Sequence, residues 1–116
     1  MLATALGCVL LEAVAIAQDT SAQNATFSQC AACHSVDGTK GTGPTLKGIM
    51  GRTSGSVPGF RYSRAMKSAA ITWDEGSVDR YLSNPQDVVP GNIMPFSGVP
   101  DAAQRANLIA YLKTLR

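Results

Sequence analysis

Two cysteines and the only histidine of the chain stand together in the segment Cys30-Ala31-Ala32-Cys33-His34. Thiols three residues apart on a helical turn lie on one face, so each can add to one vinyl group of a haem. The histidine that follows is placed where its imidazole can bind the iron. This spacing predicts covalent attachment of one haem c through Cys30 and Cys33, with His34 as an iron ligand. No other feature of the sequence constrains the fold as strongly.

Two other uses of these residues fit the sequence less well. A redox-active C-x-x-C pair needs a strand-helix-strand context, and no run of alternating β-branched residues predicts a strand. A structural zinc site needs four nitrogen or sulfur ligands. The chain beyond residue 17 offers two cysteines and one histidine.

The length of 116 residues gives room for a single domain, and the 45% apolar and 16% charged residues are ordinary globular values. The net charge is +2 and the chain has no basic run. This charge is too small to indicate a nucleic-acid partner. Domains of this size often need a cofactor to complete their core.

The first seventeen residues differ from the rest. Residues 2–17 are apolar apart from Glu12, and they end in Ala15-Ile16-Ala17. This pattern resembles the core and cleavage site of a signal peptide, although no Lys or Arg precedes it. We therefore expect residues 1–17 to be removed on secretion to the periplasm, leaving residues 18–116 as the single haem-binding domain. The alternative is a retained membrane anchor, which would be short for a span and would bury a carboxylate.

Helical signals flank a loop in which glycine is dense, between residues 38 and 59. Five segments carry helical signals: residues 22–33, residues 63–69, a segment opened by a capping box at 72–75, a short one from Pro85, and the C-terminal segment capped by Asp101. We expect an all-α fold of four to five short helices and long loops wrapped round one haem.

The second axial ligand cannot be another histidine of this chain. It must be a methionine, a lysine, the N-terminal amine or an exchangeable small molecule. Met94 is the best candidate because prolines and a glycine stiffen its segment, Val89-Pro90-Gly91-Asn92-Ile93-Met94-Pro95-Phe96. Met50 and Met66 are the alternatives. A thioether opposite an imidazole favours ferrous iron and a high potential, and two filled axial positions favour electron transfer over catalysis.

Several segments, in this order, resemble class I cytochromes c of the bacterial type most similar to mitochondrial cytochrome c. They are CAACH, TGPTLKGIMGR, PGFRYSRA, ITW, YLSNP, VPGNIMPF and RANLIAYLK. The resemblance runs from about Phe27 to Leu115. It implies that Phe27 and Tyr111 meet where the first and last helices cross.

The resemblance also implies roles around the haem. The carbonyl of Pro44 would accept a hydrogen bond from the His34 ring, and Tyr81 would contact the sulfur of Met94. Asn92 stands by the outer propionate and could donate to it. The inner propionate would be held by three donors: Arg52, Tyr62 and Trp73. Three leucines would pack on the haem: Leu46, Leu82 and Leu112.

The function implied is that of a monomeric single-electron carrier, not an enzyme. Its partners would be redox proteins such as a cytochrome bc complex, a terminal oxidase, a photosynthetic reaction centre or a nitrogen-oxide reductase. One alternative is a haem-based sensor or peroxidase-like enzyme with a labile sixth ligand, although no second histidine supplies a distal acid or base. Another is a tethered subunit, if residues 1–17 are retained as a membrane anchor.

The charge pattern departs from that of mitochondrial members, which ring the exposed haem edge with lysines. At the matching positions this chain has Gln29, Gln86, Asp87, Ile93, Pro100 and Asp101. Its cations lie elsewhere, at Lys40, Lys47, Arg61, Arg64, Lys67 and Arg80. We predict docking that is largely apolar, near Ile93, Pro95 and Phe96, with little electrostatic steering.

Overall fold

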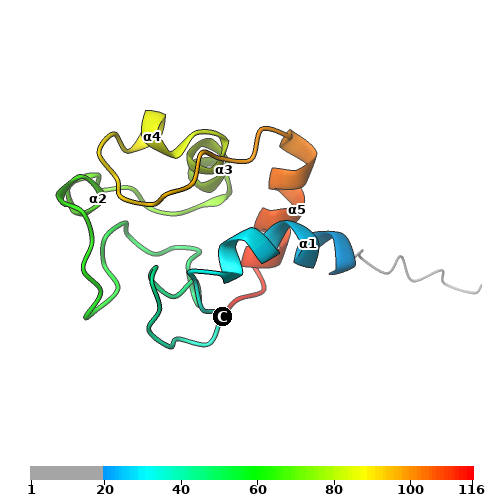
Figure 1. Cartoon of the computed structure of the whole chain (residues 1–116), viewed down its shortest axis with the longest axis horizontal. Coiled ribbons are helices and arrows are strands. Elements are labelled where there is room, and N and C mark those ends of the chain that lie inside the picture. The colour runs from blue at the N-terminus through cyan, green and yellow to red at the C-terminus, as the bar shows by residue number, and fades with distance from the viewer. Residues whose placement is uncertain (1–19) are drawn as a thin grey trace, which may run out of the picture.

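The computed structural model describes residues 20–116, with side chains from residue 25 onward. The prediction for residues 1–17 lies outside this range. The described residues form five helices: α1 (Thr20–Ala31), α2 (Arg64–Ser68), α3 (Glu75–Ser83), α4 (Pro85–Val88) and α5 (Ala102–Leu112) (Figure 1). The expected all-α fold of short helices and long loops is confirmed. None of the helices within this range is long and apolar enough to cross a membrane.

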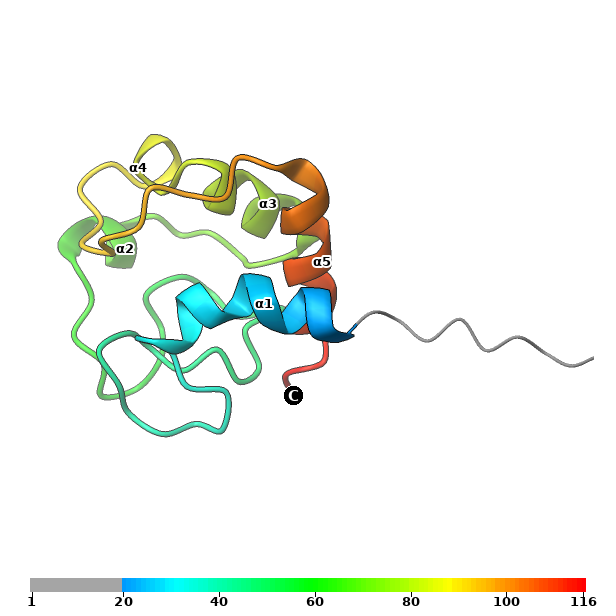
Figure 2. The same ribbon diagram turned by 45° about the vertical axis from the view of Figure 1, so that its right-hand side comes forward.

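The helices α1 and α5 pack across each other at one end of the molecule (Figure 2). The rings of Phe27 and Tyr111 lie there with centroids 4.8 Å apart and planes inclined by 53°, which confirms the expected meeting of these two residues. Leu108 of α5 is 1% exposed and anchors the core between α1 and α3. The carboxylate of Asp101 caps α5 by accepting from the amide of Gln104 at 2.8 Å.

The helix α3 begins later than the predicted capping box at residues 72–75 requires, and that prediction was wrong. The true box joins Asp74 and Ser77: the Asp74 carboxylate accepts from the Ser77 amide, and the Ser77 hydroxyl accepts from the Asp74 amide, both at 2.8 Å. Thr72 cannot cap because its backbone forms an antiparallel bridge with Thr53. That bridge ties the glycine-rich loop to the start of α3.

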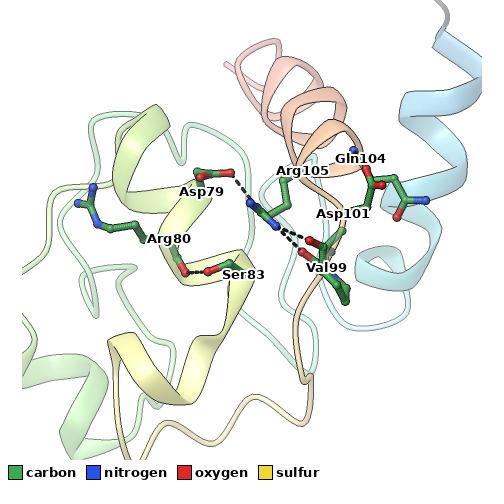
Figure 3. Close-up of polar contacts among 8 residues, drawn as sticks. Asp79, Arg80, Ser83, Val99, Asp101, Gln104 and Arg105 are labelled. Atoms are coloured by element: carbon green, nitrogen blue, oxygen red, sulfur yellow. Dashed lines mark hydrogen bonds and ion pairs between the residues drawn. The ribbon is translucent and has the colours of Figure 1, made fainter.

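Arg105 forms hydrogen bonds that hold the segment between the loop of Met94 and α5 (Figure 3). Its Nε donates to the Asp79 carboxylate of α3 at 2.8 Å, and its Nη1 donates to the carbonyls of Val99 and Pro100 at 2.9 Å each. A Cβ on Gly98, which has a φ of +115°, would lie 2.6 Å from the carbonyl oxygen of Ser83. The segment therefore lies too close to the end of α3 for any residue but glycine at this position.

Candidate functional site

A cavity of about 430 Å³ lies inside the molecule. The cysteine–histidine motif at the end of α1 lines it, as do the segment around Met94 and the inner faces of α3 and α5. The glycine-rich loop contributes further lining, so segments far apart in the sequence line the same cavity. The lining is mainly apolar, with a few hydrogen-bond donors. The three leucines expected to pack on the haem, Leu46, Leu82 and Leu112, all line this cavity.

The motif lies at the point where α1 ends. The helix stops at Ala31, two residues before the predicted end at residue 33, because the chain then tightens into a turn. The amides of Cys33 and His34 both donate to the carbonyl of Cys30, at 3.0 and 2.9 Å. Burial raises the pKa of the Cys30 thiol. The described residues form five helices and no strand, so they lack the strand-helix-strand context that a redox pair needs.

The imidazole of His34 is held from two sides. Its Nδ1 lies 2.7 Å from the carbonyl oxygen of Pro44 and donates to it. Gly43 lies against the ring, since a Cβ at this position would be 2.6 Å from the imidazole Cε1. Because Nδ1 carries the proton that it donates, Nε2 is the unprotonated nitrogen, and its lone pair can bind a metal. The sequence analysis missed Gly43, although a glycine before Pro44 signals such a close approach of backbone to side chain.

Three residues supply hydrogen-bond donors to the lining: Arg52 in the glycine-rich loop, Tyr62 between that loop and α2, and Trp73 shortly before α3. The Arg52 guanidinium donates to the carbonyls of Thr45, at 2.7 Å, and Lys47, and retains further N–H groups. Burial lowers the pKa of Arg52, but a guanidinium remains charged. The Tyr62 hydroxyl accepts from the Val57 amide at 3.0 Å, so its own hydrogen remains available.

Trp73 completes this set of donors. It is 7% exposed, and its indole N–H has no acceptor among the described residues. No fully buried side-chain nitrogen or oxygen of the described residues lacks a hydrogen-bond partner, so this N–H remains accessible. Because Trp73 lines the cavity, its N–H can donate to a ligand bound there. An apolar cavity with a cation and two free donors fits a flat apolar macrocycle that carries carboxylates. The described residues therefore fit the haem that the motif predicts.

Met94 lines the cavity with its thioether held by a neighbour. The Tyr81 hydroxyl lies 3.9 Å from the Met94 sulfur and donates to it. Burial raises the pKa of Tyr81 to about 12, so this hydroxyl is neutral at physiological pH. Of the alternative ligands, Met66 also lines the cavity, whereas Met50 packs against the core outside the lining.

Asn92 lines the cavity too, but its amide is engaged with backbone. Its Nδ2 donates to the carbonyls of Pro85, at 3.1 Å, and Val89, at 2.9 Å. Its Oδ1 accepts from the Met94 amide at 3.0 Å. Donation to a propionate, as the resemblance implies, would require one of the two Nδ2 bonds to break.

Ile93, next to Met94, is the most exposed large apolar side chain of the described residues, at 70%. It lines the rim of the cavity together with Pro95 and the half-buried Phe96. Isolated apolar side chains on a surface are common, but a cluster at the mouth of a functional cavity indicates a contact surface.

Comparison with known proteins places this site in a family. The family model described as "Cytochrome c" matches residues 21–116. The chain is 48% identical over 90 residues to the cytochrome c of Euglena viridis, covering 77% of this chain and 88% of that protein. It is 44% identical over 108 residues to the cytochrome c-type cyt cy of Rhodobacter capsulatus, covering 92% of this chain. The chain spans only about half of that relative, 54% of its length.

A solved structure has the same fold. The cytochrome cH of Methylobacterium extorquens superimposes with a TM-score of 0.78 at 39% sequence identity. The alignment covers 84% of this chain and 99% of that structure. The match therefore extends over nearly all of the residues that the structure describes.

Proposed function

The chain belongs to the cytochrome c family, and we propose that it shuttles single electrons with His34 and Met94 as the axial ligands of its iron. It carries one haem c attached through Cys30 and Cys33, and it is an electron carrier rather than an enzyme. When bound, the haem supplies the one-electron chemistry of iron. The observation that carries the proposal is that His34 and Met94 line one cavity, each held by its own neighbours.

The side chains around the cavity support rapid electron transfer in the proposed arrangement. The Pro44 carbonyl orients His34, and the Tyr81 hydroxyl contacts the Met94 sulfur. Ligands held by the protein keep similar positions in both oxidation states, so little rearrangement opposes the electron. The apolar lining and the neutral thioether favour the ferrous form. When haem is bound, the free donors of Tyr62 and Trp73, with the Arg52 cation, would hold one of its propionates.

The cellular setting is part of the proposal. Secretion with loss of residues 1–17 would place the carrier in the periplasm, between a cytochrome bc complex and an acceptor. The acceptor would be a terminal oxidase, a photosynthetic reaction centre or a nitrogen-oxide reductase. N-terminal sequencing of the mature protein tests this point: a chain that begins at Gln18 supports a free carrier, and one that retains Met1 supports a tether.

The ligation is tested by the visible spectrum of the reduced protein with and without carbon monoxide. An unchanged spectrum is expected, since both axial positions would be filled. A prompt shift on addition of carbon monoxide would overturn the proposal and favour a sensor or peroxidase-like enzyme with a labile sixth ligand.

A further inference from the structure

Two amide side chains bracket the loop that carries Met94, one from outside and one from within. The outer one is Gln86 of α4, which is exposed. Its Nε2 donates to the carbonyl of Asn92 at 2.9 Å, and its Oε1 accepts from the amide of Gly91 at 3.1 Å. Gln86 therefore bonds both a donor and an acceptor of the backbone just before Met94.

The inner amide is Asn92, which is 7% exposed. It donates to the carbonyls of Pro85 and Val89 and accepts from the amide of Met94. Both of its hydrogens and its oxygen have partners, so this buried amide is fully satisfied. The direct bond to the Met94 backbone fixes the residue whose sulfur faces the cavity.

We propose that Gln86 and Asn92 form an amide clasp that holds Met94 on the iron, which makes both of them positioning residues for electron transfer. The inference rests on the proposed ligation by His34 and Met94. A thioether is a weak neutral ligand, so its occupancy depends on how firmly the protein holds the loop. Movement of Met94 away from the iron would break bonds of the clasp, and the clasp therefore shifts the equilibrium toward the ligated state.

The backbone of this loop also forms two hydrogen bonds within the segment itself, from the Asn92 amide to the Val89 carbonyl at 3.1 Å and from the Phe96 amide to the Met94 carbonyl at 2.8 Å. Among side chains, the clasp is the main polar restraint on the loop. The Tyr81 hydroxyl reaches the Met94 sulfur at 3.9 Å, which is the outer range of such contacts. Arg105 bonds the carbonyls of Val99 and Pro100, which lie further along the chain. The predicted effect of removing the clasp is consequently local, at Met94.

The test is a titration of the ferric protein with imidazole, which competes with Met94 for the iron. Five variants are compared with the wild type: Gln86→Leu, Gln86→Glu, Gln104→Leu, Met94→Ala, and the double variant Gln86→Leu/Met94→Ala. Gln104 is the matched control because it is exposed, lies on α5, and its side chain makes no hydrogen bond with the described residues (Figure 3). Gln86→Leu should bind imidazole about tenfold more tightly than the wild type, the equivalent of the lost hydrogen bonds. Gln104→Leu should not differ from the wild type.

The double variant separates positioning from general structure. Without Met94 the sixth position is open, so Gln86→Leu should no longer change the affinity for imidazole. Gln86→Glu keeps the acceptor for the Gly91 amide and loses the donor to Asn92, so its affinity should fall between wild type and Gln86→Leu. An affinity of Gln86→Leu equal to that of Gln104→Leu would overturn the clasp. The clasp would also be overturned if Gln86→Leu raised the affinity for imidazole as much in the Met94→Ala background as it does in the wild type.

The proposed function fails in a different way. If the wild type already binds imidazole as tightly as Met94→Ala does, Met94 is not an iron ligand. Gln86 and Asn92 could then not hold Met94 on the iron, whatever affinities the Gln86 variants have. Suppose that the wild type binds imidazole more weakly than Met94→Ala does, and that Gln86→Leu has the same affinity as the wild type. Ligation by Met94 would then be supported, and only the clasp would be contradicted.

Discussion

At the scale of single residues, the phenol of Tyr81 links the site to the stability of the fold. Its pKa is raised from 10.0 to about 12 by burial. The native state therefore holds the phenolic proton more tightly than the unfolded state does. The stability that results is fully present below pH 10 and is lost as the pH rises through the folded-state pKa.

We accordingly expect the free energy of unfolding of the wild type to fall between pH 10 and 12, by on the order of 2–3 kcal/mol from this group. The Tyr81→Phe variant has no proton to lose here, and its unfolding free energy should fall less over the same range. Denaturant unfolding at several pH values measures both. Parallel curves for the two proteins would show that Tyr81 is not the group responsible.

Ala70 is the only non-glycine residue with positive φ among the described residues, at 51°. The left-handed conformation costs an alanine roughly 1–2 kcal/mol, of which glycine recovers part after its greater loss of entropy on folding. We expect Ala70→Gly to stabilise the protein by roughly 0.5–1 kcal/mol, measured by denaturant unfolding. The neighbour Ala69 has helical angles, φ −64° and ψ −29°, so Ala69→Gly should destabilise it. Loss of stability in both variants would count against strain at Ala70.

At the scale of elements, Arg105 joins α5, α3 and the segment after Met94 (Figure 3). Its side chain is 13% exposed, so replacement by leucine leaves the carbonyls of Val99 and Pro100 without a donor. We expect Arg105→Leu to lower the free energy of unfolding by about 2–3 kcal/mol, measured by denaturant unfolding.

The exposed ion pair of Lys113 and Glu75 supplies the control, with side chains 55% and 62% exposed. Lys113→Leu should change stability by less than about 0.5 kcal/mol, because exposed pairs contribute little. Equal losses of unfolding free energy in Arg105→Leu and Lys113→Leu would mean that the hydrogen bonds of Arg105 contribute no more than an exposed ion pair does.

The elements were predictable where their signals are local. Asp101 and Pro85 mark helix starts by their own chemistry, and both helices begin there. The box at the start of α3 was misassigned because Thr72 is held by Thr53, which lies far away in sequence. A capping pattern reports local preference only, and a tertiary contact can move the helix start.

The site was predictable in its composition but not in all its contacts. The motif at Cys30–His34 specifies its chemistry by spacing alone, and the prolines around Met94 indicate a stiff loop. The partners of Asn92 were not predictable, because the carbonyls of Pro85 and Val89 come within reach only after α4 turns back. Gln86 was not predicted either, because its contacts with the Gly91 amide and the Asn92 carbonyl also depend on how the chain folds back after α4.

At the scale of the whole molecule, the rim of the cavity is the surface that we predict to contact redox partners. Ile93 is 70% exposed there, where a lysine would be expected from mitochondrial members. We predict that the second-order rate of reduction by a cytochrome bc complex changes less than about threefold between low and physiological salt. Stopped-flow measurements at several ionic strengths test this.

The Ile93→Lys variant is the matched test of the same surface. It adds a cation at the rim, so its rate should become salt-dependent while the wild type stays nearly flat. A steep fall of the wild-type rate with added salt would contradict apolar docking.

The proposed electron carrier depends most directly on which methionine binds the iron. The measurement is an NMR spectrum of the ferrous protein with ¹³C-labelled methionine methyl groups, recorded for the wild type, Met94→Leu and Met66→Leu. We predict one methyl resonance shifted far upfield by the ring current of the haem, lost in Met94→Leu and retained in Met66→Leu. A shifted resonance that survives in Met94→Leu, or its absence from the wild type, would contradict the central claim.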